Sequence, residues 1–199
     1  MFESEEIATE EPVEAPLPIE TTQIQEILKP EFLYHASSNS NIAEFEPRTE
    51  SIRDPSEGPV VFGTPSKEGA SMFIVPTDDK WTRKSRFNGV YVTVIADRAR
   101  FLALDKGGSI YTLPSETFDT DETKGMGKNE WVSKEPVKPT KREDYTSGLQ
   151  AMLELGVQVY FVDEAKFIEI KDAPDHGLKV ISELKSENEE KGINPKKIQ

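Results

Sequence analysis

The chain has 199 residues, 37 acidic against 24 basic side chains, no cysteine, 35% hydrophobic residues and a formal charge of -13. This length is enough for one domain of ordinary size, and too short for two large ones. The lack of cysteine excludes disulfides, thiolate zinc sites and a cysteine nucleophile, and two histidines are too few for a histidine-rich metal site.

The negative charge is concentrated near the N-terminus. Residues 1–20 hold seven glutamates and no Lys or Arg, so they carry -7, and the rest of the chain carries only -6. Residues 1–21, with prolines among the glutamates, have too few large apolar groups to offset the entropy lost on ordering. We therefore predict a disordered acidic tail over 1–21, a single domain over 22–191 and a frayed end over 192–199.

The first half of the domain is expected to alternate short elements with polar loops. A helix is predicted over 22–28, because a hydroxyl residue opens this segment and a proline follows it. Buried strands are predicted over 32–36 and 59–64. The second strand leads directly into an amphipathic helix over 66–74, where apolar residues recur at helical spacing.

The middle third is rich in strand patterns and the last third in helix patterns. Residues 81–86 form a basic and aromatic cluster, and residues 118–129 have the Gly, Asp and Lys content of an exposed loop. Strands are predicted over 90–95, 101–104, 109–113, 130–139 and 157–162, and helices over 144–155, 163–170 and 175–191. These elements predict an α+β fold with about six or seven strands and peripheral helices.

The sequence lacks the motifs of several common enzyme classes. It has no Walker-type phosphate loop, no Gly-x-Gly-x-x-Gly, no Gly-x-Ser-x-Gly elbow and no His-Glu-x-x-His. No apolar run approaches the roughly 18 to 20 residues of a membrane span, and the first residues do not have the pattern of a secretory signal. The acidic composition also disfavours nucleic acid as a partner, because binding to phosphate needs clustered Lys and Arg. We expect a cytoplasmic protein that does not contact the membrane and holds no metal.

Three short stretches carry the residue types that binding or catalysis needs. They are Tyr34-His35-Ala36-Ser37-Ser38, then Val60 to Phe73 (VVFGTPSKEGASMF), and Asn129-Glu130-Trp131-Val132-Ser133. Taken alone, each has an ordinary structural explanation. These are a histidine satisfied by backbone groups, apolar helix positions that pack in the core, and a solvated glutamate at a strand end.

In this order, the three stretches resemble the ADP-ribosyltransferase superfamily. The resemblance is to its His-Tyr-Glu branch, which includes diphtheria-type toxins and poly(ADP-ribose) polymerases. The motifs of that branch read His-Gly-Ser/Thr, Tyr-Phe-Ala followed by Ser-Lys-x-Ala-x-Tyr, and Asn-Glu-Tyr-x-Val. The present sequence departs from them at Ala36, in place of glycine, and at Phe62 and Met72 or Phe73, in place of tyrosines. The matching stretches cover about 25 of the 199 residues.

The resemblance implies a split, mostly antiparallel β-sheet core and NAD as a substrate. It implies that His35 holds the adenosine ribose, that Ser37 bonds the nicotinamide side, and that Phe62 and Phe73 stack on the nicotinamide ring. Glu130 would hold the 2'-hydroxyl of the nicotinamide ribose and stabilise the positive charge that develops as the glycosidic bond breaks. The side chains of His35 and Glu130 are then expected to face one cleft.

Further residues are assigned more loosely. Arg48 and Arg53, in the loop after the first strand, are candidates for the pyrophosphate, although loop arginines are more often solvated. Residues 108–118 and 130–139 also resemble small uncharacterised bacterial and phage-type proteins of this fold, which would put Tyr111 near the cleft. These candidates predict a mono-ADP-ribosyltransferase-like enzyme with an unknown acceptor, expected to be a protein.

Two alternatives remain open from the sequence. A catalytically inactive protein of the same fold could serve as a binding module, because Ala36 and Met72 narrow the nicotinamide slot. An RNA 2'-phosphotransferase shares the fold and also uses NAD. That enzyme needs a basic cleft, for which only residues 81–86 qualify here.

Overall fold

The computed structural model describes residues 28–49, 58–121, 123–124 and 127–190. Nearly all of the predicted helix over 22–28, the predicted acidic tail and the predicted frayed end lie outside these residues. The described part is a mixed α+β structure in which most strand pairs are antiparallel. This confirms the α+β class predicted from the sequence.

Nine strands, five α-helices and a 3-10 turn make up the described residues. The strands are β1 (Phe32–Ser37), β2 (Val61–Gly63), β3 (Thr82–Phe87), β4 (Val90–Ile95), β5 (Gly108–Pro114), β6 (Phe118–Asp119), β7 (Trp131–Ser133), β8 (Lys141–Tyr145) and β9 (Gln158–Phe161). The helices are α1 (Lys67–Ser71), α2 (Arg98–Leu104), α3 (Gly148–Glu154), α4 (Glu164–Asp172) and α5 (Leu178–Glu190), and the 3-10 turn is η2 (Gly127–Asn129).

The strands form three small sheets, two of which are linked. The first has the order β1-β5-β8, the second β2-β7-β6 and the third β3-β4-β9, in which only β4 and β9 run parallel. Two backbone hydrogen bonds between Tyr34 and Thr64 join β1 to the end of β2. The first two sheets therefore continue into each other in the order β8-β5-β1-β2-β7-β6.

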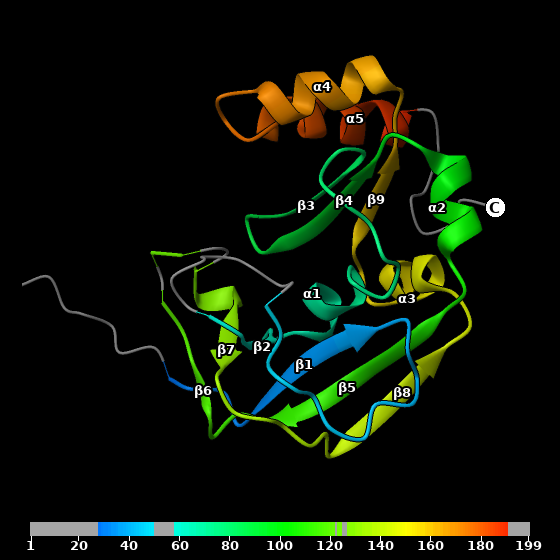
Figure 1. The fold of residues 1–199 in the computed structure, drawn as a ribbon. Coiled ribbons are helices and arrows are strands. Elements are labelled where there is room, and N and C mark those ends of the chain that lie inside the picture. Colours follow the sequence, from blue (N-terminus) through cyan, green and yellow to red (C-terminus); the bar gives the residue numbers. More distant parts are fainter. Residues whose placement is uncertain (1–27, 50–57, 122, 125–126, 191–199) are drawn as a thin grey trace, which may run out of the picture.

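The elements lie in layers. In Figure 1, α1 and α3 lie between the β1-β5-β8 sheet and the β3-β4-β9 sheet, while α4 and α5 cover the far side of the latter. Helix α1 contacts both β1 and α3, and α3 contacts β9, so these short helices connect the two sheets. Each begins at a serine whose side chain accepts a backbone hydrogen bond, Ser66 for α1 and Ser147 for α3.

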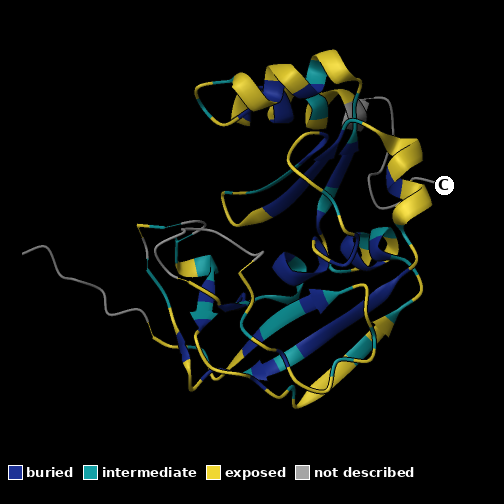
Figure 2. Cartoon of the chain, in the orientation of Figure 1, coloured by how far each residue is buried: buried dark blue, intermediate teal, exposed yellow. Residues whose placement is uncertain are grey.

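Apolar side chains fill the space on both sides of each sheet. Figure 2 shows the buried residues in β1, β4, β5 and the two inner helices, and exposed residues along α4 and α5. A cluster that includes Leu33, Tyr111 and Trp131 lies on one face of the joined sheets, and a cluster with Ala36, Ala70 and Ile110 lies on the other. The joined sheets therefore have two distinct faces, and side chains alternate between them along β1.

Three secondary-structure predictions need correction. Residues 118 and 119, predicted as part of an exposed loop, form strand β6, and Phe118 is fully buried. Residues 101–104 are the end of helix α2 rather than a strand, because the Asp97 carboxylate caps the helix by accepting a hydrogen bond from the Arg100 backbone. A run of four apolar residues does not distinguish a buried strand from the end of a helix. Residues 144 and 145, predicted as helix, belong to β8, and the helix begins only after Ser147.

Strand β3 was not predicted, although the sequence contains a signal for it. The β3–β4 hairpin turns at Asn88-Gly89, and both residues have positive φ, 48° and 84°. Asn-Gly is the dipeptide that tight hairpin turns of this kind favour. The basic and aromatic cluster at residues 81–86 therefore lies at the start of a hairpin, on the edge strand of the third sheet.

Candidate functional site

A small cavity lies between the joined strands β1 and β2 and the loop that follows β1. Its volume is about 100 Å³. It is lined by His35, Ser37, Ile42, Phe45, Glu46, Arg48, Val60, Val61 and Phe62. Sites for whole ligands usually have about 300 to 1,000 Å³. The cavity therefore has room for one ring-sized group, with the rest of a larger ligand outside it.

His35 forms one wall of this cavity and is neutral near pH 7. Burial holds its pKa below the usual value of a histidine, and the positive charge of Arg48 lowers the pKa further, against the opposing effect of the bond to Phe62. The Nδ1 atom lies 2.8 Å from the carbonyl oxygen of Phe62. Because a carbonyl can only accept, Nδ1 carries the proton, and Nε2 of the neutral ring is a hydrogen-bond acceptor.

The loop that follows β1 supplies further lining residues, Phe45, Glu46 and Arg48. Phe45 exchanges two backbone hydrogen bonds with Val137, of 2.8 and 2.9 Å, and Arg48 exchanges two with Val60, of 3.1 and 3.3 Å. The Phe45 ring packs against the ring of His35, with 4.5 Å between ring centroids. Sequence reasoning found Arg48 but missed Phe45 and Glu46, because the bridge that holds Phe45 pairs it with Val137, a residue far along the chain.

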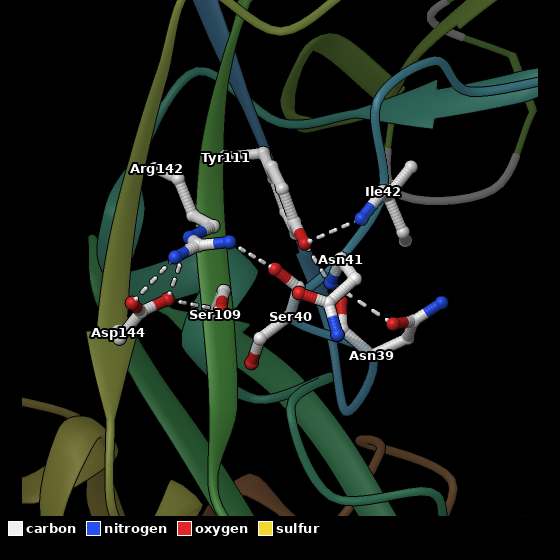
Figure 3. Close-up of polar contacts among 8 residues, drawn as sticks. All are labelled: Asn39, Ser40, Asn41, Ile42, Ser109, Tyr111, Arg142 and Asp144. Carbon is white, nitrogen blue, oxygen red and sulfur yellow. Dashed lines mark hydrogen bonds and ion pairs between the residues drawn. The ribbon is translucent and has the colours of Figure 1, made fainter.

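Tyr111 supports the cavity from below but does not line it. Its side chain is almost fully buried, and its ring packs edge-on against Phe45. Figure 3 shows its hydroxyl donating to the backbone oxygen of Asn39 at 2.7 Å and accepting from the backbone nitrogen of Ile42 at 3.2 Å. Tyr111 therefore holds the loop between β1 and Phe45.

A second anchor fixes the same loop to β8. Arg142 donates to the backbone oxygen of Ser40, and it is held in place by an ion pair with Asp144 at 2.9 Å. Asp144 in turn accepts a hydrogen bond of 2.6 Å from Ser109, on the neighbouring strand (Figure 3). The loop that carries one wall of the cavity is thus held to β5 and β8 by side chains.

We expect the change Tyr111→Phe to loosen this loop while leaving the fold intact. It removes the two hydrogen bonds between the buried hydroxyl and the backbone of the loop, which should lower the free energy of unfolding by about 1 to 2 kcal/mol. Amide hydrogen exchange at Ile42 should accelerate at least tenfold. The control is Tyr160→Phe, because the Tyr160 hydroxyl donates a hydrogen bond to Gln158 in the third sheet, away from this loop. Unchanged exchange at Ile42 in the Tyr111 variant would contradict the anchoring role.

Glu130 does not line the cavity. It directly precedes β7, whose first residue, Trp131, pairs with Gly63 and packs in the cluster that contains Leu33 and Tyr111. That cluster lies on the face of the sheet to which His35 belongs. Glu130 itself lies between η2 and β7, and its backbone nitrogen donates to the carbonyl oxygen of Gly127 at 2.9 Å, so its backbone belongs to the turn rather than to the strand.

The third sheet reaches the residue that precedes Glu130. Arg86, on β3, donates to the side-chain oxygen of Asn129 at 3.0 Å, so this hairpin reaches the start of β7. Phe73, just after α1, is 46% exposed, and the Lys84 ammonium lies 4.4 Å from the centre of its ring. Burial lowers the pKa of Lys84 to about 8, with Asp79 opposing this shift.

The predicted site residues therefore fall into two groups. His35, Ser37, Arg48 and Phe62 line one cavity, and Tyr111 supports it. Phe73 and Glu130 lie outside that cavity, and Arg53 is outside the described residues.

Within the described residues, no group of three or more His, Asp or Glu side chains is arranged to hold a metal ion. The helices of this part of the chain include none with the length and apolar character needed to cross a bilayer. Comparison of the chain with protein-family models, with curated protein sequences and with solved structures found no match in any of the three.

Proposed function

We propose that the protein is an ADP-ribosyltransferase-like protein that binds NAD, with a ribose of NAD in the His35 cavity. The observation that carries this proposal is the arrangement of the three stretches that resemble the family. They are far apart in the sequence, yet they form the adjacent strands β1, β2 and β7. The His35 ring is bonded directly to the backbone of β2.

The chemistry of the cavity suits a ribose and its phosphate. The neutral ring of His35 offers an acceptor for a ribose hydroxyl, and the Arg48 guanidinium supplies a positive charge for a phosphate oxygen. The volume of about 100 Å³ admits one ring of the dinucleotide and leaves the remainder on the surface.

The finer part of the proposal is transfer of ADP-ribose. In that reaction the bond between nicotinamide and ribose breaks, nicotinamide leaves with the bonding electrons, and the acceptor forms a new bond to the ribose carbon. The acceptor is proposed to be a protein group. Glu130 would stabilise the positive charge on the ribose in the transition state, as the resemblance implies.

A second candidate is a binding module that holds NAD without cleaving it. The lining of the cavity favours this function, because it includes His35 and Arg48 but not Glu130. In such a protein, NAD would bind through His35 and Arg48 and remain intact.

Calorimetric titration with NAD, combined with an assay for released nicotinamide, tests both functions. We expect millimolar or tighter binding that weakens at least tenfold in His35→Ala. Because His35 is already neutral, affinity should change little between pH 7 and 8. If the protein is a transferase, Glu130→Gln should bind NAD normally but release nicotinamide about 100-fold more slowly.

The outcomes separate the two candidates. Binding without nicotinamide release by the unaltered protein would support the binding module and overturn transfer. No binding at millimolar NAD would overturn both. Circular dichroism of each variant shows whether a loss of binding reflects a loss of fold.

A further inference from the structure

We infer that Glu46 is the carboxylate that holds the ribose hydroxyls of the ligand in the His35 cavity. The inference rests on the proposed function and adds the residue that selects for an intact ribose. Among the carboxylate side chains of the described residues, Glu46 alone lines this cavity. Neither Glu130 nor its neighbours contribute to the lining.

The backbone of Glu46 is held in place although it belongs to a loop. Phe45, immediately before it, is fixed by two hydrogen bonds to Val137, and Arg48, two residues later, by two to Val60. Pro47 follows Glu46, and a residue before proline is restricted to extended conformations. The chain therefore presents the Glu46 side chain from a constrained backbone position, so that binding needs little further ordering of the backbone.

The residues that line the cavity offer both hydrogen-bond acceptors and donors to a ligand. A carboxylate has only acceptors when ionised, and a ribose diol offers two hydroxyl donors, so one carboxylate can bind both hydroxyls. His35 offers another acceptor, and Arg48 offers donors that suit a phosphate. A ribose with a 5'-phosphate is the chemical unit that matches this set of groups.

The exposure of Glu46 is consistent with contact to a ligand from solution. Glu46 is exposed and also lines the cavity, whereas the neighbouring Phe45 ring is buried against His35 and Tyr111. Glu44, two residues earlier, is also exposed but does not line the cavity. The two glutamates thus form a matched pair for mutation.

The test compares two ligands that differ only in the ribose hydroxyls. Binding of ADP and of 2',3'-dideoxy-ADP is measured by calorimetry for the unaltered protein and for Glu46→Gln, Glu44→Gln and Glu130→Gln. We expect the unaltered protein to bind ADP at least tenfold more tightly than the dideoxy analogue. Glu46→Gln should reduce this ratio to below threefold, while Glu44→Gln and Glu130→Gln should keep it.

Both ligands carry the same phosphates, so any effect of a substitution on phosphate binding cancels in the ratio of the two affinities. A ratio that stays near tenfold in Glu46→Gln would overturn the role of Glu46, and so would a ratio that falls equally in Glu130→Gln. If the unaltered protein binds NAD but does not distinguish the two ADP ligands, the inference fails while the proposed function stands. If it binds neither NAD nor ADP, both fail.

Discussion

Replacing Gly107 by alanine should lower the free energy of unfolding by more than about 3 kcal/mol, which corresponds to a fall in Tm of roughly 6 to 12 °C for a domain of this size. Gly107 has φ of +73°, a conformation that L side chains rarely adopt. An added Cβ would lie 2.3 Å from the backbone oxygen of Tyr145 and 2.8 Å from backbone atoms of Thr146. Because these are backbone atoms, relief of the contact must displace the end of β8.

Gly156→Ala is the matched control for this experiment. Gly156 also has a positive φ, +92°, but an added Cβ there has no heavy atom within 4 Å. In its alanine variant the free energy of unfolding should fall by only about 1 to 2 kcal/mol, which is the cost of placing an L residue at positive φ. Urea denaturation of both variants measures the difference. Equal losses would show that the close approach of β8 to Gly107 does not contribute.

The second large effect is expected at Asp105, which organises the same corner of the molecule. Its carboxylate accepts hydrogen bonds from the backbone of Gly148 at 2.6 Å and Leu149 at 3.0 Å, and from the Ser147 hydroxyl at 2.7 Å. It thereby binds the N-terminus of α3 to the segment before β5. Asp105→Ala should lower the free energy of unfolding by about 2 to 4 kcal/mol at pH 7, measured by urea denaturation.

The contribution of Asp105 should depend on pH in a defined direction. Burial alone would raise its pKa, but the hydrogen bonds from Ser147, Leu149, Gly148 and Gly107 outweigh burial and hold the pKa below its usual value. A carboxylate with a lowered pKa stabilises the folded state fully above the unfolded pKa of about 3.9. This stabilisation is lost as the pH falls through the folded pKa.

The stability difference between the unaltered protein and Asp105→Ala should therefore shrink between pH 5 and pH 2. Asp105→Asn provides the control, because it keeps the shape of the side chain without its charge. The difference in stability between Asn and Ala variants should stay nearly constant over this range. If the difference in stability between the unaltered protein and Asp105→Ala did not change with pH, this would contradict the ionised, hydrogen-bonded state of Asp105.

The strands that were predicted correctly are those whose apolar residues form a run bounded by polar turns, such as β1 and β4. The strand predicted over residues 101–104 was wrong because Asp97, which lies outside the apolar run, caps a helix there. Strand β8 was not predicted because its charged residues give no apolar pattern. It forms by pairing with β5, about 30 residues earlier. Such long-range pairing leaves no mark in a local pattern.

The site was predictable only in part for a related reason. His35 and Phe62 lie on consecutive strands that pair in space, so their proximity follows from a simple hairpin-like arrangement of β1 and β2. Glu130 ends a 3-10 turn and lies outside the His35 cavity, and the strand pattern predicted over residues 130–139 does not reveal this placement. Glu46 reaches the cavity through isolated bridges, which no periodicity reveals.

The interleaving of the sheets in the sequence has a consequence for how the domain acquires its structure. The parallel partners β4 and β9 are separated along the chain by β5 and β8, which belong to another sheet together with β1. The strands of each sheet therefore do not come from one continuous segment of the described chain. Closing these long loops costs entropy before the pairings form, so we expect the sheets to assemble cooperatively and more slowly than a helical domain of similar size.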